Sequence, residues 1–382
     1  MRAVVQDREA LLSMLPVNMA AYLRTHGWQE IQKESGRYSI WSRSGGPRGP
    51  QILLPLRRDF EDYAIRASQV LAAIEQVEDR SQLEILRDIS TIFADVIRIR
   101  SKHDQLRDGS VPLDGGVALT RASRDLLLAA ACATISAKPF FTTRKPDDAL
   151  RYVEGLRMGQ TEQGSFVLTI QSPVTPDLQG DLLPEQDSDP FERKVTKTLM
   201  RALASLGDAA EQSAATGSIK PFEDAVHLGV SANLCDALAN LQEETAAESV
   251  EVRMSWAPVR PMEEPEIRAS VVVPQEVMPL IREASRVFRD FTPQEDVEID
   301  GLVTVLKRED DSEGIVTITG WVEGRPRKIR VFLSGSDYDR AIEAHRLRAL
   351  VHCEGNLIKE GRSYRLQEPH DFSIEETPGE GE

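Results

Sequence analysis

The sequence has few cysteines, few aromatic residues and no long apolar run. Its three cysteines, Cys132, Cys235 and Cys353, lie far apart and form no CxxC pair, which predicts buried, reduced thiols rather than a disulfide framework. The longest apolar run, Leu126–Ala133, is much shorter than the roughly 20 residues of a membrane-spanning helix. The first residues, MRAVVQDREA, lack the apolar segment of a signal peptide. These absences predict a cytoplasmic protein without membrane contacts.

Common catalytic and phosphate-binding motifs are absent as well. The chain has no GxxxxGK[ST] loop, no GxGxxG after a strand and no GxSxG elbow, which argues against P-loop enzymes, dinucleotide-dependent oxidoreductases and α/β-hydrolases. The closest histidines are His345 and His352, and Cys353 adjoins the second. Because neighbours on a strand point to opposite faces, His352 and Cys353 should not share a metal. No metal site, cofactor or catalytic residue is predicted.

The chain also has a large excess of acidic residues. Its formal net charge is −16 over 382 residues, of which 41% are hydrophobic and 28% charged. This composition and length are those of a globular protein with two or three domains. General binding to polyanions needs a positive face, so any contact with nucleic acid has to come from a local patch.

Residues 1–99 are predicted to form a helix-strand-strand-strand-helix unit. Pro16 suits the first turn of a helix that Gly27 ends, and Ser35-Gly36 is a turn pair suited to a hairpin. A third strand, Gln51–Leu56, is expected before a long helix with Asp59 as its cap.

This element order resembles the double-stranded-RNA-binding fold and the small toxins that share it. The resemblance covers about 60 residues and depends on the order of elements. The toxins have a histidine after the hairpin glycine, whereas Gly36 is followed here by Arg37-Tyr38-Ser39. The missing histidine argues against ribonuclease activity.

Residues 100–290 are predicted to be a helix-rich α/β region that packs with the first unit. Asp189 is expected to cap the predicted helix Pro190–Ala209. Its strands and those of the first unit are expected to share one sheet covered by helices. The predicted helices are Ala118–Ile135, Pro190–Ala209, Pro221–Glu243 and one from Pro274 to Asp290, and the predicted strands are Val250–Trp256 and Glu266–Val273.

Residues 295–375 have the most informative pattern in the chain. Three strands, a helix and two strands are expected at Val297–Lys307, Gly314–Trp321, Arg327–Leu333, Ser336–His345, Leu350–Ile358 and Ser363–Leu366. This order is typical of an OB-like barrel, a module that commonly binds nucleic acid or protein. Residues 376–382 should be an acidic, disordered tail. The predicted fold class is therefore α+β, a mixed α/β body with a small C-terminal OB-like β-barrel.

A resemblance agrees with this reading of the C-terminal residues. The stretches Gly324–Arg327 and Cys353–Leu366 resemble the last strands of an OB-type barrel. The whole chain is loosely similar to uncharacterised bacterial proteins with the same ending. The resemblance implies a bacterial protein and brings no function with it.

The barrel segment also contains the predicted binding residues: Trp321, Arg325, Arg327, Lys328, Arg330 and Tyr364. Single-strand-binding proteins use such cations for phosphates and such rings for stacking on bases. Strand alternation should turn Lys328 and Arg330 outward, with Ile329 and Val331 inside the barrel. However, Trp321 and Phe332 can also serve to fill the barrel. Residues 295–368 hold 12 Lys and Arg against 15 Asp and Glu, so a protein partner is as reasonable as single-stranded nucleic acid.

One pattern suggests an enzyme instead. Pro176-Asp177 followed by Glu192-Arg193-Lys194 has the spacing of a PD-ExK nuclease, in which carboxylates bind Mg²⁺ and a lysine lies near the attacking water. The ExK residues should be on a strand, but Glu192 is predicted to begin a helix and to complement its dipole. The sequence therefore favours a non-catalytic accessory or adaptor protein of a bacterial multi-component system. The alternative is a divergent metal-dependent nuclease.

Overall fold

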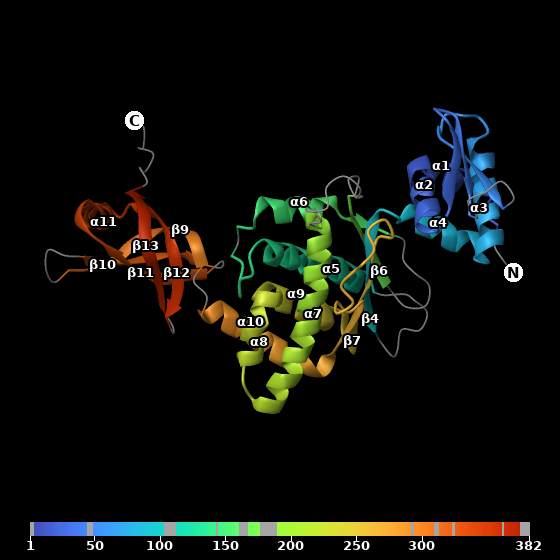
Figure 1. Ribbon diagram of the computed structural model, residues 1–382. Helices are drawn as coiled ribbons and strands as arrows, with labels where there is room; N and C mark the ends of the chain where they lie inside the picture. Colours follow the sequence, from blue (N-terminus) through green and yellow to red (C-terminus); the bar gives the residue numbers. More distant parts are fainter. Residues whose placement is uncertain are drawn as a thin grey trace.

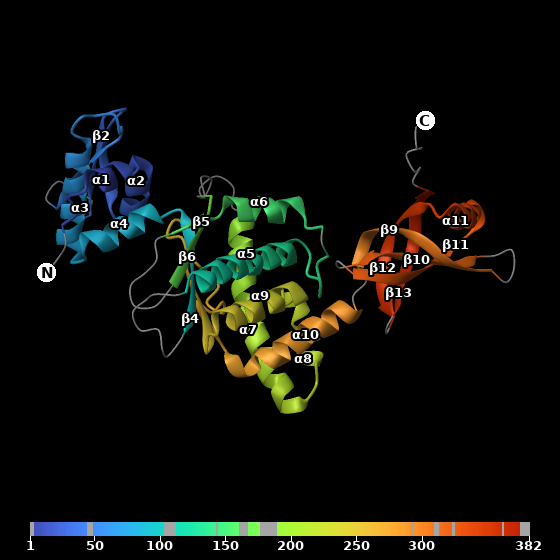
Figure 2. The ribbon, with the colours of Figure 1, turned by 180° about the vertical axis from the view of Figure 1, so that it is seen from behind.

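The computed structural model shows three bodies in a row, each with its own hydrophobic core (Figure 1). An N-terminal unit and a C-terminal barrel lie at opposite ends of a larger central body, as the reverse view also shows (Figure 2). No helix in the part of the chain that the structure describes has the length and apolar character needed to cross a bilayer. The structure describes residues 4–43, 49–102, 112–142, 144–159, 167–175, 189–291, 294–308, 313–322, 325–360 and 363–374.

The N-terminal unit is a three-stranded antiparallel sheet packed against helices. The predicted helix-strand-strand-strand-helix order is present from α2 to α3. The predicted cap of α3 is wrong, because Asp62 precedes the helix and the Asp59 carboxylate accepts a hydrogen bond from Arg57 at 2.9 Å. The elements are α1 (Arg8–Ser13), α2 (Pro16–Thr25), β1 (Gln29–Glu34), β2 (Tyr38–Ser42), β3 (Gln51–Pro55), α3 (Tyr63–Glu78) and α4 (Gln82–Ser90).

The central body contains a second sheet, so the prediction of one shared sheet is wrong. Its strand order is β5-β6-β4-β7-β8 and every pair is antiparallel. The predicted boundary at residue 99 falls within the middle strand of this sheet. The strands are β4 (Ala94–Lys102), β5 (Arg157–Met158), β6 (Val167–Pro173), β7 (Ser249–Ser255) and β8 (Ser270–Pro274).

Long helices lie on one side of the central sheet (Figures 1 and 2). The predicted helix Pro221–Glu243 is interrupted, because Gly229 has a φ of +102° and Ser231 caps a new helix at its N-terminus. Asp189 forms ion pairs with Lys197 and Arg260 instead of capping. The helices are α5 (Leu113–Ile135), α6 (Asp147–Gly155), α7 (Phe191–Thr216), α8 (Lys220–Asp224), η1 (Val226–Leu228), α9 (Ala232–Thr245), η2 (Gln275–Val277) and α10 (Met278–Phe291).

A buried ion pair joins the central sheet to α7. Asp95 at the start of β4 is fully buried, and Arg193 of α7 is only 1% exposed. The guanidinium donates two hydrogen bonds of 2.9 Å to the carboxylate, which also accepts from the Thr196 hydroxyl and the Ala257 backbone N–H. Arg193 also donates to the Arg260 carbonyl and lies over the Trp256 ring. This network connects a strand, a helix and the loop after β7.

The C-terminal body is a closed five-stranded barrel with the order β10-β11-β13-β12-β9, compatible with an OB-like barrel. All predicted strands and the helix are present. A Cβ atom on Gly301 would lie 2.4 Å from the Thr319 carbonyl oxygen, so two backbones approach closely there. The elements are β9 (Gln294–Lys307), β10 (Gly314–Val322), β11 (Arg325–Leu333), α11 (Gly335–Leu347), β12 (Leu350–Glu360) and β13 (Ser363–Ile374). The predicted tail at residues 376–382 is outside the described residues.

We expect the barrel to be a separable domain that begins after about Asp290. Its core cluster contains residues of the barrel alone, and a domain with its own core can fold independently. A fragment from roughly Thr292 to the C-terminus should therefore unfold cooperatively when heated. Limited proteolysis of the whole chain should release a similar fragment. A fragment that stays unfolded by circular dichroism would show that the barrel needs the central body.

Candidate binding surface of the barrel

Two neighbouring strands of the barrel present the predicted cations to the outside. Ile329 and Val331 of β11 are fully buried, whereas Lys328 and Arg330 are exposed. This alternation confirms the predicted orientation of the two cations. The next outward residue of β11 is Phe332, which is partly buried.

Trp321 of β10 lies on the same outer side. It is 70% exposed, so it does not fill the barrel. Trp321 is paired with Pro326, and Thr319 is paired with Lys328 in the antiparallel register. Trp321 and Lys328 are therefore diagonal neighbours on one face of the two strands. Long side chains at such positions can reach each other. We call the set Thr317, Thr319, Trp321, Lys328, Arg330 and Phe332 the Trp321 face.

Arg365 of β13 extends this face and was missed by the sequence analysis. Its guanidinium carbon lies 4.5 Å from the centre of the Phe332 ring, a cation–π contact. Arg365 is also paired with Arg330 in the parallel register of β11 and β13. The alternation of buried Tyr364 and Leu366 around Arg365 was the available signal. The parallel pairing of β11 with β13, which places the two arginines side by side, could not be read from either strand alone.

The other predicted binding residues are placed differently. Tyr364 is 8% exposed and belongs to the barrel core. Arg327 is partly buried, and its guanidinium carbon lies 5.9 Å from the centre of the Tyr364 ring. These two residues therefore pack on each other beside the core instead of joining the Trp321 face. The side chain of Arg325 is outside the described part of the chain.

An apolar strip borders the Trp321 face along β9 and β12. Leu302 is paired with Thr319 on one side and with Leu350 on the other, and Val305 is paired with Thr317. All three aliphatic residues are exposed: Leu302 by 42%, Leu350 by 46% and Val305 by 49%. The outer surface of the barrel therefore combines cations, an indole and aliphatic groups.

Of the candidate nuclease residues, the structure describes the Glu192-Arg193-Lys194 part. As predicted, Glu192 is in the first turn of a helix, α7, rather than on a strand. Lys194 is two residues further along the same helix, and residues two apart do not face each other on a helix. Pro176 and Asp177 are outside the described residues.

A cavity of about 230 Å³ lies in the central body and is lined by residues of α5, α9 and α10. Its charged groups have partners in the chain: Lys145 donates to the carbonyls of Phe141 and Thr142, and Asp236 accepts from Arg289 and Ser285. Burial lowers the pKa of Lys145 and raises the pKa of the Cys132 thiol. A thiol with a raised pKa is a poor nucleophile, so Cys132 is poorly suited to nucleophilic catalysis.

In comparisons with known proteins, no family model, no curated protein and no solved structure matches the chain.

Proposed function

We propose that the protein is a non-catalytic accessory protein of a bacterial multi-component system and that its barrel binds single-stranded nucleic acid on the Trp321 face. The observation that supports this most directly is the exposed indole of Trp321 beside the outward cations Lys328 and Arg330. An aromatic ring in water costs free energy unless a ligand covers it. Bases stack on such rings while neighbouring cations contact the phosphates.

The strand arrangement agrees with this role. In OB-fold proteins the second and third strands carry the ligand-binding face, and β10 and β11 are the second and third strands of this barrel. Phe332 and Arg365 extend the same face with a second ring and a third cation. The outward cations supply a local positive patch in a chain that is otherwise strongly acidic.

A protein partner is the second candidate. The exposed aliphatic residues Leu302, Val305 and Leu350 favour it, because bases and phosphates make little use of such side chains. Under this alternative the partner has an apolar ridge that covers Leu302, Val305 and Leu350. It also has acidic groups that contact Lys328 and Arg330.

The test is the binding of a fluorescently labelled oligodeoxythymidylate to the full chain at low salt. Changing Trp321 to Ala should weaken binding by roughly 5- to 150-fold, because stacking of one base on an aromatic ring contributes about 1–3 kcal/mol. Ile342→Ala is the matched control, since Ile342 is an exposed apolar residue of α11 in the same barrel.

The control variant should bind like the wild type. If the wild type binds no oligonucleotide at low salt, the nucleic-acid proposal fails. Equal weakening by both variants would instead indicate a general disturbance of the barrel.

A further inference from the structure

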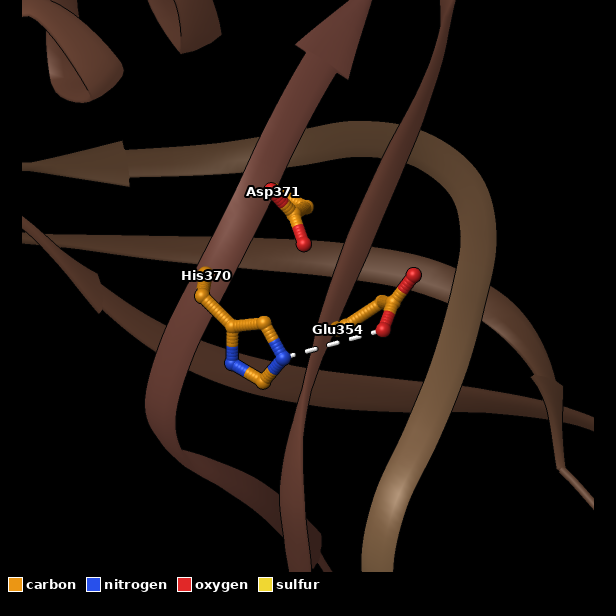
Figure 3. Close-up of side chains that lie close together, drawn as sticks. All are labelled: Glu354, His370 and Asp371. Carbon is orange, nitrogen blue, oxygen red and sulfur yellow. Dashed lines mark ion pairs between the residues drawn. The ribbon is translucent and has the colours of Figure 1, made fainter.

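Histidines and carboxylates from β9, β12 and β13 gather on the outer wall of the barrel. Glu354 of β12 is paired with His370 of β13 across the antiparallel register. One oxygen or nitrogen atom from each of Glu354, His370 and Asp371 lies within 4.8 Å of the other two (Figure 3). Spacing along the sequence drew attention to His345, His352 and Cys353 instead and did not indicate this group.

A second histidine lies beside the same carboxylate. His352 Nε2 is 3.3 Å from Glu354 Oε1, and His370 Nε2 is 3.6 Å from Glu354 Oε2. The two imidazoles therefore approach one carboxylate from two strand positions.

The opposite nitrogen of each ring faces an acceptor. His352 Nδ1 is 2.7 Å from the Asp300 carboxylate, and His370 Nδ1 is 3.0 Å from the Glu368 carbonyl oxygen. Histidines that bind metals usually donate Nδ1–H to a carboxylate or backbone carbonyl, which fixes the ring and leaves Nε2 for the metal. Both rings have this arrangement.

We propose that Glu354, His370 and Asp371 bind a divalent transition metal such as Zn²⁺. Imidazole nitrogens and carboxylate oxygens are ordinary Zn²⁺ ligands, and three of them leave a fourth tetrahedral position for water. His352, which lies between Asp300 and Glu354, and the Glu368 carbonyl act as positioning groups. Ligand atoms around Zn²⁺ lie about 2 Å from the metal, so the exposed side chains have to close slightly around it.

The backbone of β13 supports this assignment. Glu368 and Asp371 have φ values of +50° and +51°, a left-handed conformation that costs energy in residues other than glycine. These two positions flank His370 and bring Asp371 onto the same side of the barrel as Glu354 (Figure 3). A metal held here would tie the end of β13 to β12 and thereby stabilise the barrel.

The test uses the full chain after treatment with a chelator. Titration with zinc chloride, followed by calorimetry, should show one bound ion per chain and a higher melting temperature of the barrel. Glu354→Gln and His370→Ala should each weaken zinc binding about 100-fold or more. His352→Ala and Asp300→Asn should weaken it about 10- to 100-fold, the range for groups that orient the ligands.

His227→Ala is the matched control, because His227 Nδ1 also contacts a backbone carbonyl but the residue is on the central body. It should leave zinc binding unchanged. The proposal is overturned if the wild type binds no zinc, or if Glu354→Gln and His370→Ala bind it as tightly as the wild type. Circular dichroism of each variant without metal shows whether the fold is retained, and the exposed positions of His370 and Asp371 make that the expected result.

Discussion

Changing Asp95 to Ala is expected to destabilise the central body by about 3–5 kcal/mol, the usual cost of removing one partner of a buried ion pair. Arg193 is 1% exposed, so its guanidinium would stay in the interior without the carboxylate that now accepts two of its hydrogen bonds. The Thr196 hydroxyl and the Ala257 N–H would lose an acceptor as well. Unmatched buried donors add to the cost.

Hydrogen exchange of the β4 amides measures this loss in the body that contains the network, separately from the other two cores. Asp208→Ala is the matched control, because Asp208 pairs with Arg268 at 3.1 Å on the surface, where both side chains are at least half exposed. The control should cost about 0–1 kcal/mol. If both variants lower the protection of β4 equally, the network is not a major source of stability.

Replacing both charged partners separates the value of the ion pair from the penalty of leaving one charge alone. Asp95→Leu combined with Arg193→Met should be more stable than Asp95→Ala, because no unpaired charge remains in the interior. Recovery should be partial, since Ala257 N–H and Thr196 still lack their acceptor. A double variant as unstable as the single one would mean that packing volume, rather than charge, determines the loss.

The barrel was the most predictable part of the fold. Its strands alternate between buried and exposed residues, and its helix has the usual spacing, so each element is encoded within about ten neighbouring residues. The same alternation placed Lys328 and Arg330 on the outer side correctly. Alternation alone did not place Tyr364, because a tyrosine on a strand suits either the inside or the outside of a barrel. The register of the strand decides which side it faces, and here Tyr364 is buried.

The central sheet was harder to predict because its pairing is long-range. β4 pairs with β6 and with β7, whose residues are about 70 and 150 positions further along the chain. Nothing in the local sequence of Ala94–Lys102 indicates those partners. The break in the predicted helix Pro221–Glu243 could have been predicted from the sequence. Gly229 is a typical helix-ending residue and Ser231 is a typical N-terminal cap of the next helix.

The proposed metal ligands Glu354, His370 and Asp371 could not be predicted from the sequence for a different reason. Glu354 and His370 are paired only because β12 and β13 have register shifts near Glu354, and a shift of one residue would turn His370 to the other side. Bulges of this kind depend on the packing of the whole barrel. Spacing along the chain, which made His345 and His352 seem the closest pair, gives no information about them.

Reversing the two outward cations of β11 should have the largest effect on the proposed nucleic-acid binding. Each phosphate contact on a single strand contributes about 0.7 to the slope of log affinity against log salt. Changing Lys328 and Arg330 to Glu removes two such contacts, so the slope should become shallower by about 1.4. The new carboxylates also repel the phosphates, so binding at low salt should fall more than for Trp321→Ala.

The matched control reverses two cations elsewhere on the same barrel. Arg346 and Arg348 are exposed at the end of α11, and changing both to Glu alters the net charge by the same amount. If the Trp321 face binds the strand, this control should keep both the affinity and the slope close to those of the wild type. Equal losses in the two double variants would point to a non-specific effect of net charge. Unchanged binding after reversal of Lys328 and Arg330 would exclude this face as the nucleic-acid site, and the exposed strip of Leu302, Val305 and Leu350 would then favour a protein partner.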